Sequence, residues 1–184
     1  MATPSRAHRA PNTVSPESPE RQRSISVESH LLADDGRFLN SPYPALIYRG
    51  VFGPTEADLA RAFDGLFDSN GWPPAWRAGL YTMHHYHSSA HEVLGIFSGW
   101  VEARLGGEGG PLVTLRAGDA VLIPAGVAHK NEGESRDFCA VGAYPSGMRV
   151  DMRYGREGER SSDARRLAQL PPPTPDPIFG TQAP

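Results

Sequence analysis

The sequence predicts a mainly β protein of a single domain, with a sandwich or barrel architecture. Its 184 residues and its mass of 19.9 kDa match the usual size of one domain. The 20 glycines and 18 prolines are too many for a helical bundle, because both residue types disfavour helix interiors. Between residues 79 and 144, short apolar runs are separated by Gly, Pro and Ser at intervals of about eight to twelve residues, as in sandwiches and barrels.

Charge and composition exclude several classes of partner. The formal net charge is −3 and the isoelectric point is about 6.1, so the chain offers no basic field for nucleic acid or an anionic membrane. No segment approaches the roughly 18 apolar residues of a membrane-spanning helix, and the N-terminus lacks the apolar stretch of a secretory signal. The single cysteine, Cys139, excludes an internal disulfide and suits a reducing compartment. We therefore expect a cytoplasmic protein that binds neither nucleic acid nor a membrane.

Along the chain, the first segment predicts no stable structure. Residues 1–24 contain four prolines among Ser, Arg and Glu and almost nothing apolar, so we expect a disordered leader. An organelle transit peptide is the weaker interpretation, because the prolines would break its amphipathic helix. Residues 25–78 then predict short N-terminal strands and one flanking helix, with the best strand at residues 45–48.

The one clear helix is predicted from about residue 54 to residue 70. Thr55, followed three residues later by Asp58, resembles a capping box, and Asn70 with the next glycine is a stop signal. The apolar residues of this segment share one face: Leu59, Phe63, Leu66 and Phe67. This stripe predicts a helix that packs on the sheet.

Residues 79–145 are the predicted barrel core, and residues 146–184 form a C-terminal arm. The arm is polar and arginine-rich, and it has five prolines between residues 171 and 177. This composition predicts either an extended arm against the domain or a flexible tail. The expected architecture is therefore one barrel with one flanking amphipathic helix.

Histidines give the strongest chemical signal. Five of the seven lie between residues 81 and 130: His84, His85, His87, His91 and His129. On a strand, His85 and His87 would project to the same side about 7 Å apart, whereas His84 would point away. By itself, such a pair is more often two surface polar residues than two metal ligands.

Two further residues could complete a metal site. Glu92 follows the predicted turn at residues 88–89, so the next strand can return its carboxylate to the same place. His129 follows the bend at residues 124–126, which could bring in a distant segment. Three imidazoles and one carboxylate suit a divalent transition metal such as Fe, Mn, Ni, Cu or Zn.

The spacing of these residues resembles the two signature motifs of the cupin superfamily. The first motif is matched by Gly79, His85, His87, Glu92 and Gly99, and the second by Gly118, Pro124, Gly126 and His129. The asparagine that ends the second motif would fall at Gly133, whereas Asn131 lies two residues earlier. The resemblance implies a cupin, or double-stranded β-helix (jelly-roll), barrel in which His85, His87, Glu92 and His129 bind the metal.

From about residue 31 to residue 180, the chain is similar to small single-domain YjlB-like cupins. The similarity is carried by residues 47–50, 70–72, 84–95, 106–110 and 142–145. This family includes cupin-domain oxidoreductases of fungal polyketide gene clusters, among them those for salicylaldehyde-type products. The resemblance implies a role in secondary-metabolite biosynthesis, with other pathway enzymes as partners, and a monomer that often forms a homodimer.

The predicted pocket is apolar with one polar group. Tyr81 and Met83 would share a face with His85 and His87, and Leu94 and Ile96 would share one with Glu92. Tyr81 is the candidate catalytic residue, as a hydrogen-bond donor or proton relay, and a plain packing role is its alternative. We expect His91 and Lys130 to face away from the metal, and Cys139 to be a small buried residue without a redox role.

Three functions follow from these residues. The first is a metal-dependent oxidoreductase for a small organic substrate, such as a phenolic or polyketide intermediate, with the ion polarising a hydroxyl or carbonyl group and activating dioxygen. The second is a non-redox metal-dependent isomerase or lyase, such as a cyclase or dehydratase, with the same ligands. The third is a non-catalytic accessory protein that holds a small molecule. No Gly-rich dinucleotide-binding loop follows a strand into a helix, so we expect no resident nicotinamide or flavin.

Overall fold

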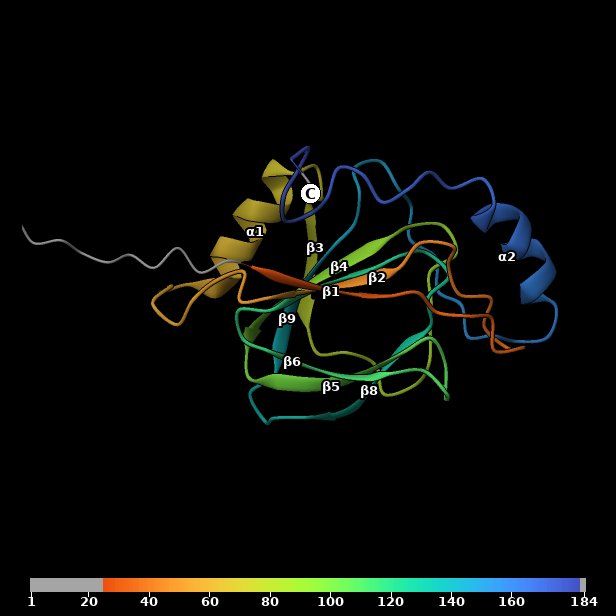
Figure 1. Ribbon diagram of the computed structural model, residues 1–184, viewed down its shortest axis with the longest axis horizontal. Coiled ribbons are helices and arrows are strands. Elements are labelled where there is room, and N and C mark those ends of the chain that lie inside the picture. Colours follow the sequence, from red (N-terminus) through yellow and green to blue (C-terminus); the bar gives the residue numbers. More distant parts are fainter. Residues whose placement is uncertain (1–24, 183–184) are drawn as a thin grey trace, which may run out of the picture.

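The computed structural model describes residues 25–182, and the predicted leader at residues 1–24 lies outside them. The described chain forms two antiparallel β-sheets and two helices (Figure 1). The larger sheet has the order β1 (Ser26–His30), β2 (Ala45–Arg49), β7 (Ala120–Ile123), β4 (Glu92–Ser98), β9 (Cys139–Ala143) and β3 (Pro74–Ala78). The smaller sheet has the order β6 (Leu112–Arg116), β5 (Trp100–Leu105) and β8 (His129–Glu134). The prediction of a mainly β fold is confirmed.

The main core joins the two sheets. On β4, Leu94 and Ile96 point to the same side and belong to one buried cluster with Val101 and Leu105 of β5. This alternation of inward and outward residues is the period of two that a strand imposes. The cluster therefore closes the apolar face of each sheet against the other, and Glu92, two residues before Leu94, faces the same interior.

The opposite face of the larger sheet is covered by helix α1 (Leu59–Ser69), whose Phe63 and Phe67 are fully buried with Val93 and Val141. At Gly95, a Cβ atom would lie only 2.4 Å from the Phe63 ring. A glycine is therefore required where the helix meets β4. The predicted apolar stripe is confirmed.

The start of α1 differs from the prediction of residue 54 with a Thr55 cap. The N-cap is Asp58, whose carboxylate accepts a hydrogen bond from the Arg61 backbone amide at 3.0 Å. The amide of Glu56 instead closes a turn on the Gly53 carbonyl at 3.1 Å. A carboxylate that reaches the third helical amide satisfies the helix end at Asp58, so the preceding residues form a turn.

The C-terminal arm contains a second helix, α2 (Glu159–Leu167), so the prediction of a single flanking helix is wrong. Only Asp163 and Leu167 of α2 are buried, which explains why the sequence shows no apolar stripe there. In Figure 1, α1 and α2 lie at opposite ends of the molecule, and the chain returns from α2 toward α1.

The segment after α2 is anchored along this return path, so it is an arm against the domain and not a flexible tail. Trp72 donates its indole hydrogen to the Pro175 carbonyl at 2.8 Å, and Tyr48 donates to Asp176 at 2.7 Å. Ile178 joins the cluster beneath α1. Neither helix of the described residues is long and apolar enough to cross a bilayer.

Candidate metal centre

The structure brings together the four predicted ligands, which come from three separate segments. His85 and His87 lie in the segment after β3, Glu92 begins β4, and His129 begins β8. One ring nitrogen of each histidine lies within 4.8 Å of the others. The Glu92 carboxylate approaches the Nε2 atoms of His87 and His129 at 3.4 and 3.3 Å.

The distance between the two histidine segments is set by backbone pairing. His85 and His129 exchange hydrogen bonds between their backbone amides and carbonyls, at 3.1 and 2.9 Å. Gly126 donates its backbone amide to the His87 carbonyl at 2.8 Å and has a φ of +93°. A Cβ atom there would lie 2.6 Å from the Asn40 carbonyl oxygen, so only glycine fits this bend. The second motif therefore positions His129 through its glycine.

All three imidazoles are oriented by backbone carbonyls. The Nδ1 atom of His85 lies 3.2 Å from the Met83 carbonyl oxygen. The corresponding distances are 2.5 Å from His87 to the Asp151 carbonyl and 3.1 Å from His129 to the Val127 carbonyl. A carbonyl can only accept, so each Nδ1 carries a proton, and the lone pair lies on Nε2 whenever the ring is neutral. This is the arrangement that prepares histidines to bind a metal.

Electrostatics at the centre favour a cation. Burial disfavours the charged form of Glu92, but the hydrogen bonds that His129 and His87 donate when their Nε2 atoms carry a proton outweigh burial and hold the pKa of Glu92 below its ordinary value. Burial and the neighbouring His129 lower the pKa of His85 to about 3, so this ring is neutral. Burial also disfavours the charged form of His87, whereas the Glu92 carboxylate outweighs burial and raises the His87 pKa.

The residues therefore fit a divalent transition metal. A buried carboxylate needs a compensating positive charge, and the Nε2 atoms of His87 and His129 lie 3.4 and 3.3 Å from it, with His85 as the third ring of the group. Imidazole and carboxylate together suit Fe, Mn, Ni, Cu and Zn. His85, His87, His129 and Glu92 would hold the ion.

A pocket of about 400 Å³ opens above these four residues. Its apolar wall includes Leu80, Leu94 and Met152, and Trp76 adds an aromatic face. Leu94 therefore shares the pocket with Glu92, as predicted. A pocket of this size and composition can hold a small organic molecule beside the metal centre.

Tyr144 is a site residue that the sequence reasoning did not select. Its hydroxyl donates to the Glu92 carboxylate at 2.8 Å and accepts the indole hydrogen of Trp76 at 2.9 Å. Burial and the Glu92 charge raise the pKa of Tyr144, so the phenol keeps its proton. The only signal in the sequence was the resemblance of residues 142–145 to the YjlB-like group, which gave Tyr144 no role.

Tyr81 and Met83 differ from the prediction of a shared, inward face. Residues 79–84 lie outside the strands, so their side chains do not alternate regularly. Tyr81 lines the pocket at its exposed rim, 60% accessible, with its ring 5.1 Å from the His85 ring. Met83 is 56% accessible and does not line this pocket.

The other singled-out residues lie away from the centre. His91 is buried, as its Nδ1 accepts the Ala125 amide at 3.0 Å and its Nε2 donates to the Pro171 carbonyl at 2.9 Å. Lys130 forms ion pairs on the far side of β8, and Cys139 is half-buried. The predictions that His91 and Lys130 face away are confirmed.

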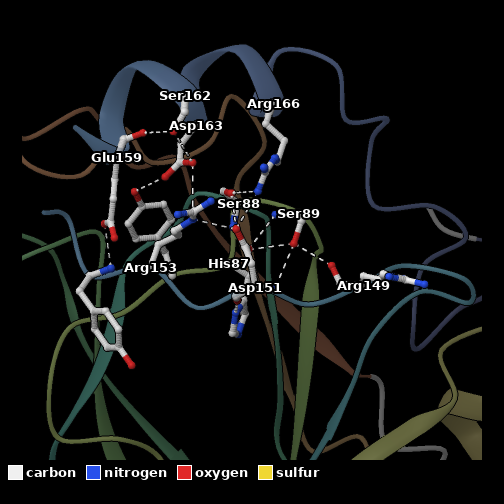
Figure 2. Close-up of polar contacts among 12 residues, drawn as sticks. His87, Ser88, Ser89, Arg149, Asp151, Arg153, Glu159, Ser162, Asp163 and Arg166 are labelled. Atoms are coloured by element: carbon white, nitrogen blue, oxygen red, sulfur yellow. Dashed lines mark hydrogen bonds and ion pairs between the residues drawn. The ribbon is translucent and has the colours of Figure 1, made fainter. Parts of the chain in front are cut away.

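The carbonyl that orients His87 belongs to Asp151, whose carboxylate anchors the surrounding loop (Figure 2). This carboxylate accepts hydrogen bonds at 2.6 to 2.9 Å from the amide and hydroxyl of Ser88, the hydroxyl of Ser89 and the guanidinium groups of Arg153 and Arg166. Burial disfavours the charged form of Asp151, but the hydrogen bonds of Ser88 and Ser89 outweigh burial and lower its pKa to about 2.

Helix α2 also contacts the segment that carries His85 and His87, and the Asp151 carboxylate beside it. Asp163 of α2 is fully buried and accepts a hydrogen bond at 2.7 Å from Tyr86, the residue between His85 and His87. Arg166, also on α2, donates to Asp151 at 2.9 Å. Figure 2 shows α2 lying across this group of residues. The C-terminal arm therefore contributes to the position of the candidate ligands.

Fold and site together define a mainly β, two-sheet protein with a candidate metal centre of three histidines and one glutamate. No family model matches the chain. The chain is 37% identical over 159 residues to the uncharacterized protein YjlB of Bacillus subtilis (strain 168), across 86% of this chain and 93% of that protein. The protein therefore belongs to the YjlB family.

One solved structure gives a weaker comparison. The 11S allergen of Cocos nucifera matches 78% of this chain with a TM-score of 0.36 and 15% identity, and this chain covers 37% of that protein. A similarity at this level carries no argument about fold or function.

Proposed function

We propose that this protein is a metal-dependent cupin oxidoreductase that acts on a small organic substrate. The observation that carries the proposal is the convergence of three Nε2 lone pairs and the Glu92 carboxylate at the base of an apolar pocket. A bound divalent transition metal would supply Lewis acidity and, for a redox-active ion, electron transfer. The residues of the pocket would position Glu92, bind the substrate and transfer protons.

Tyr144 and Trp76 control the carboxylate. Trp76 donates to the Tyr144 hydroxyl, which directs the phenol hydrogen to Glu92. This chain of hydrogen bonds fixes the Glu92 side chain, with one oxygen on Tyr144 and the other facing His87 and His129. Glu92 is thereby held ionised and in place while a substrate enters or leaves.

The walls of the pocket would bind and orient the substrate. Leu80, Leu94 and Met152 offer apolar contacts that exclude water, and Tyr81 at the rim places a phenol hydroxyl where it could donate a hydrogen bond or move a proton. A phenolic or polyketide intermediate, as in secondary-metabolite biosynthesis, matches such walls. We also propose that the protein forms a homodimer and acts in the cytoplasm with other enzymes of its pathway.

A non-redox isomerase or lyase is the second candidate, and the tyrosines favour it. Tyr81 and Tyr144 both reach the pocket, so two phenol groups stand beside the candidate metal and could take part in proton transfer. Such a reaction needs the same metal ligands but leaves the elemental composition of an isomerisation product unchanged. A dehydration would instead remove water from the substrate.

The test is to incubate metal-loaded protein with phenols and polyketide alcohols, and to record oxygen consumption and product mass. Loss of two hydrogens or gain of oxygen supports the oxidoreductase, whereas an unchanged mass or loss of water supports the isomerase or lyase. The variant Glu92→Gln should abolish turnover, and the control Glu102→Gln, on β5 outside the pocket, should not. Full activity of metal-free protein would contradict both proposals.

A further inference from the structure

A second pocket lies on the other side of the segments that carry the candidate ligands. Its volume is about 510 Å³. The ionisable side chains that line it are Arg37, His84, Glu108, Lys130, Tyr154 and Arg156. His84 precedes His85 and Lys130 follows His129, yet both line this second pocket and neither lines the pocket of the metal centre. None of these six residues is used by the proposed function.

The pocket carries an excess of positive charge. Arg37, Lys130 and Arg156 face it, against the single carboxylate of Glu108. Among the described residues, neither arginine has a carboxylate within ion-pair distance. Arg37 donates to the Tyr154 carbonyl at 2.9 Å, and the Arg156 guanidinium lies 4.8 Å from the centre of the Tyr154 ring. Both guanidinium groups therefore have hydrogen-bond donors left for a ligand.

His84 supplies a second and independent observation. Its side chain is only 4% exposed, yet neither ring nitrogen has a hydrogen-bond partner among the described residues. A buried polar atom without a partner costs about 1–3 kcal/mol, so such atoms are uncommon unless something else satisfies them. In either protonation state the ring carries at least one N–H donor. His84 thus offers an unused donor at the base of a cationic pocket.

The position of the Glu108 carboxylate indicates which chemical group the second pocket would bind. Its carboxylate lies 3.0 Å from the Lys130 ammonium and 3.5 Å from His84 Nε2. The Glu108 side chain is 71% exposed, and two glycines stand on each side of it at residues 106–107 and 109–110. A side chain that is so exposed can rotate into solvent at low cost. Its carboxylate therefore occupies a position that an external oxyanion could take.

We propose that this second pocket binds an oxyanion, the phosphate or carboxylate group of a small molecule. Arg37, Lys130 and Arg156 would hold the charge, His84 would donate a hydrogen bond, and Glu108 would move aside. Guanidinium groups match planar carboxylates and phosphates through paired donors. The other acid near Lys130, Glu132, pairs with it at 3.2 Å and also with Arg104, so Glu132 stays outside the pocket.

The test measures binding of inorganic phosphate and of acetate to the full-length protein by calorimetry at constant ionic strength. We expect saturable binding in the millimolar range or tighter, and the tighter of the two anions identifies the chemical class. Arg156→Gln should weaken binding about tenfold, because a hydrogen bond to a charged group is lost. Arg156 is exposed, so this variant should fold normally, and Arg37→Gln is a second variant with the same expected effect.

The matched control is Arg61→Gln, which removes the same charge from the exposed face of α1 and should leave the affinity unchanged. Glu108→Gln should tighten binding, because it removes the internal competitor. Lys130 is the only lysine of the chain, so phosphate should also slow its modification by an amine-reactive reagent. No saturable binding, or equal binding by wild type, Arg156→Gln and Arg37→Gln, would overturn the proposal. Phosphate held at the metal centre would give the second of these results.

Discussion

Asp151 offers the sharpest test of how the arm supports the metal centre. In Asp151→Asn the carbonyl that orients His87 remains, but the carboxylate that fixes it between Ser88, Ser89 and Arg166 is lost. We expect His87 to be less well oriented, and metal affinity to fall about 10–100-fold, as for other groups that orient metal ligands.

The effect on stability can be estimated from the pKa of Asp151. Its pKa is about 2 in the folded protein against an ordinary value of 3.8, and each unit corresponds to about 1.36 kcal/mol. After a discount for its 23% exposed side chain, the charged form contributes about 1–2 kcal/mol. A lowered pKa stabilises the fold above pH 3.8, and this contribution falls to roughly half near pH 3 and is lost as the pH approaches 2.

The assay combines urea unfolding with a competition titration against a chromophoric chelator. The control is Asp119→Asn, which removes a carboxylate bound to Arg49 and to two backbone amides, far from the pocket. Both variants should lose stability at neutral pH, but only Asp151→Asn should lose metal affinity. Equal metal affinity of wild type and Asp151→Asn would refute the reasoning, whatever the change in stability.

Three further predictions concern the pocket and the helix. Tyr144→Phe should keep the metal, measured by elemental analysis, but lower kcat, because Glu92 loses its hydrogen bond; an unchanged kcat would contradict the role of Tyr144. Gly95→Ala should cost about 1–3 kcal/mol in urea unfolding because its Cβ would meet Phe63, whereas the control Gly65→Ala, with open space around it, should be neutral or stabilising. Glu92→Gln should lose the metal and keep the fold, as seen by circular dichroism, and retained metal would contradict its role as a ligand.

The sequence predicted the candidate ligands because their geometry depends on local rules. Alternation placed His85 and His87 on one side, and the Gly126 bend brought His129 to them. The same alternation correctly turned Lys130 and His91 away. Where the chain is extended and glycine marks the turns, motif spacing was sufficient to predict that these side chains lie close together.

The contributions of the arm could not be predicted from apolar periodicity. Helix α2 is held by a buried carboxylate, Asp163, and by Arg166, neither of which adds to an apolar stripe. Tyr144 reaches Glu92 across 52 residues of sequence, a pairing that depends on the register of β9 beside β4. The prediction that Met83 faces the pocket was wrong for a different reason. It applied the two-residue period of a strand to residues 79–84, which form no strand. Long-range polar contacts and departures from regular strands leave no periodic signal.

Metal stoichiometry tests the central claim most directly. Protein purified without chelator should contain about one divalent transition-metal ion per chain, and His129→Ala should lose most of it while keeping its circular dichroism spectrum. Wild-type protein that takes up no such ion when offered Fe, Mn, Ni, Cu and Zn, or a His129→Ala variant with undiminished metal, would contradict the account.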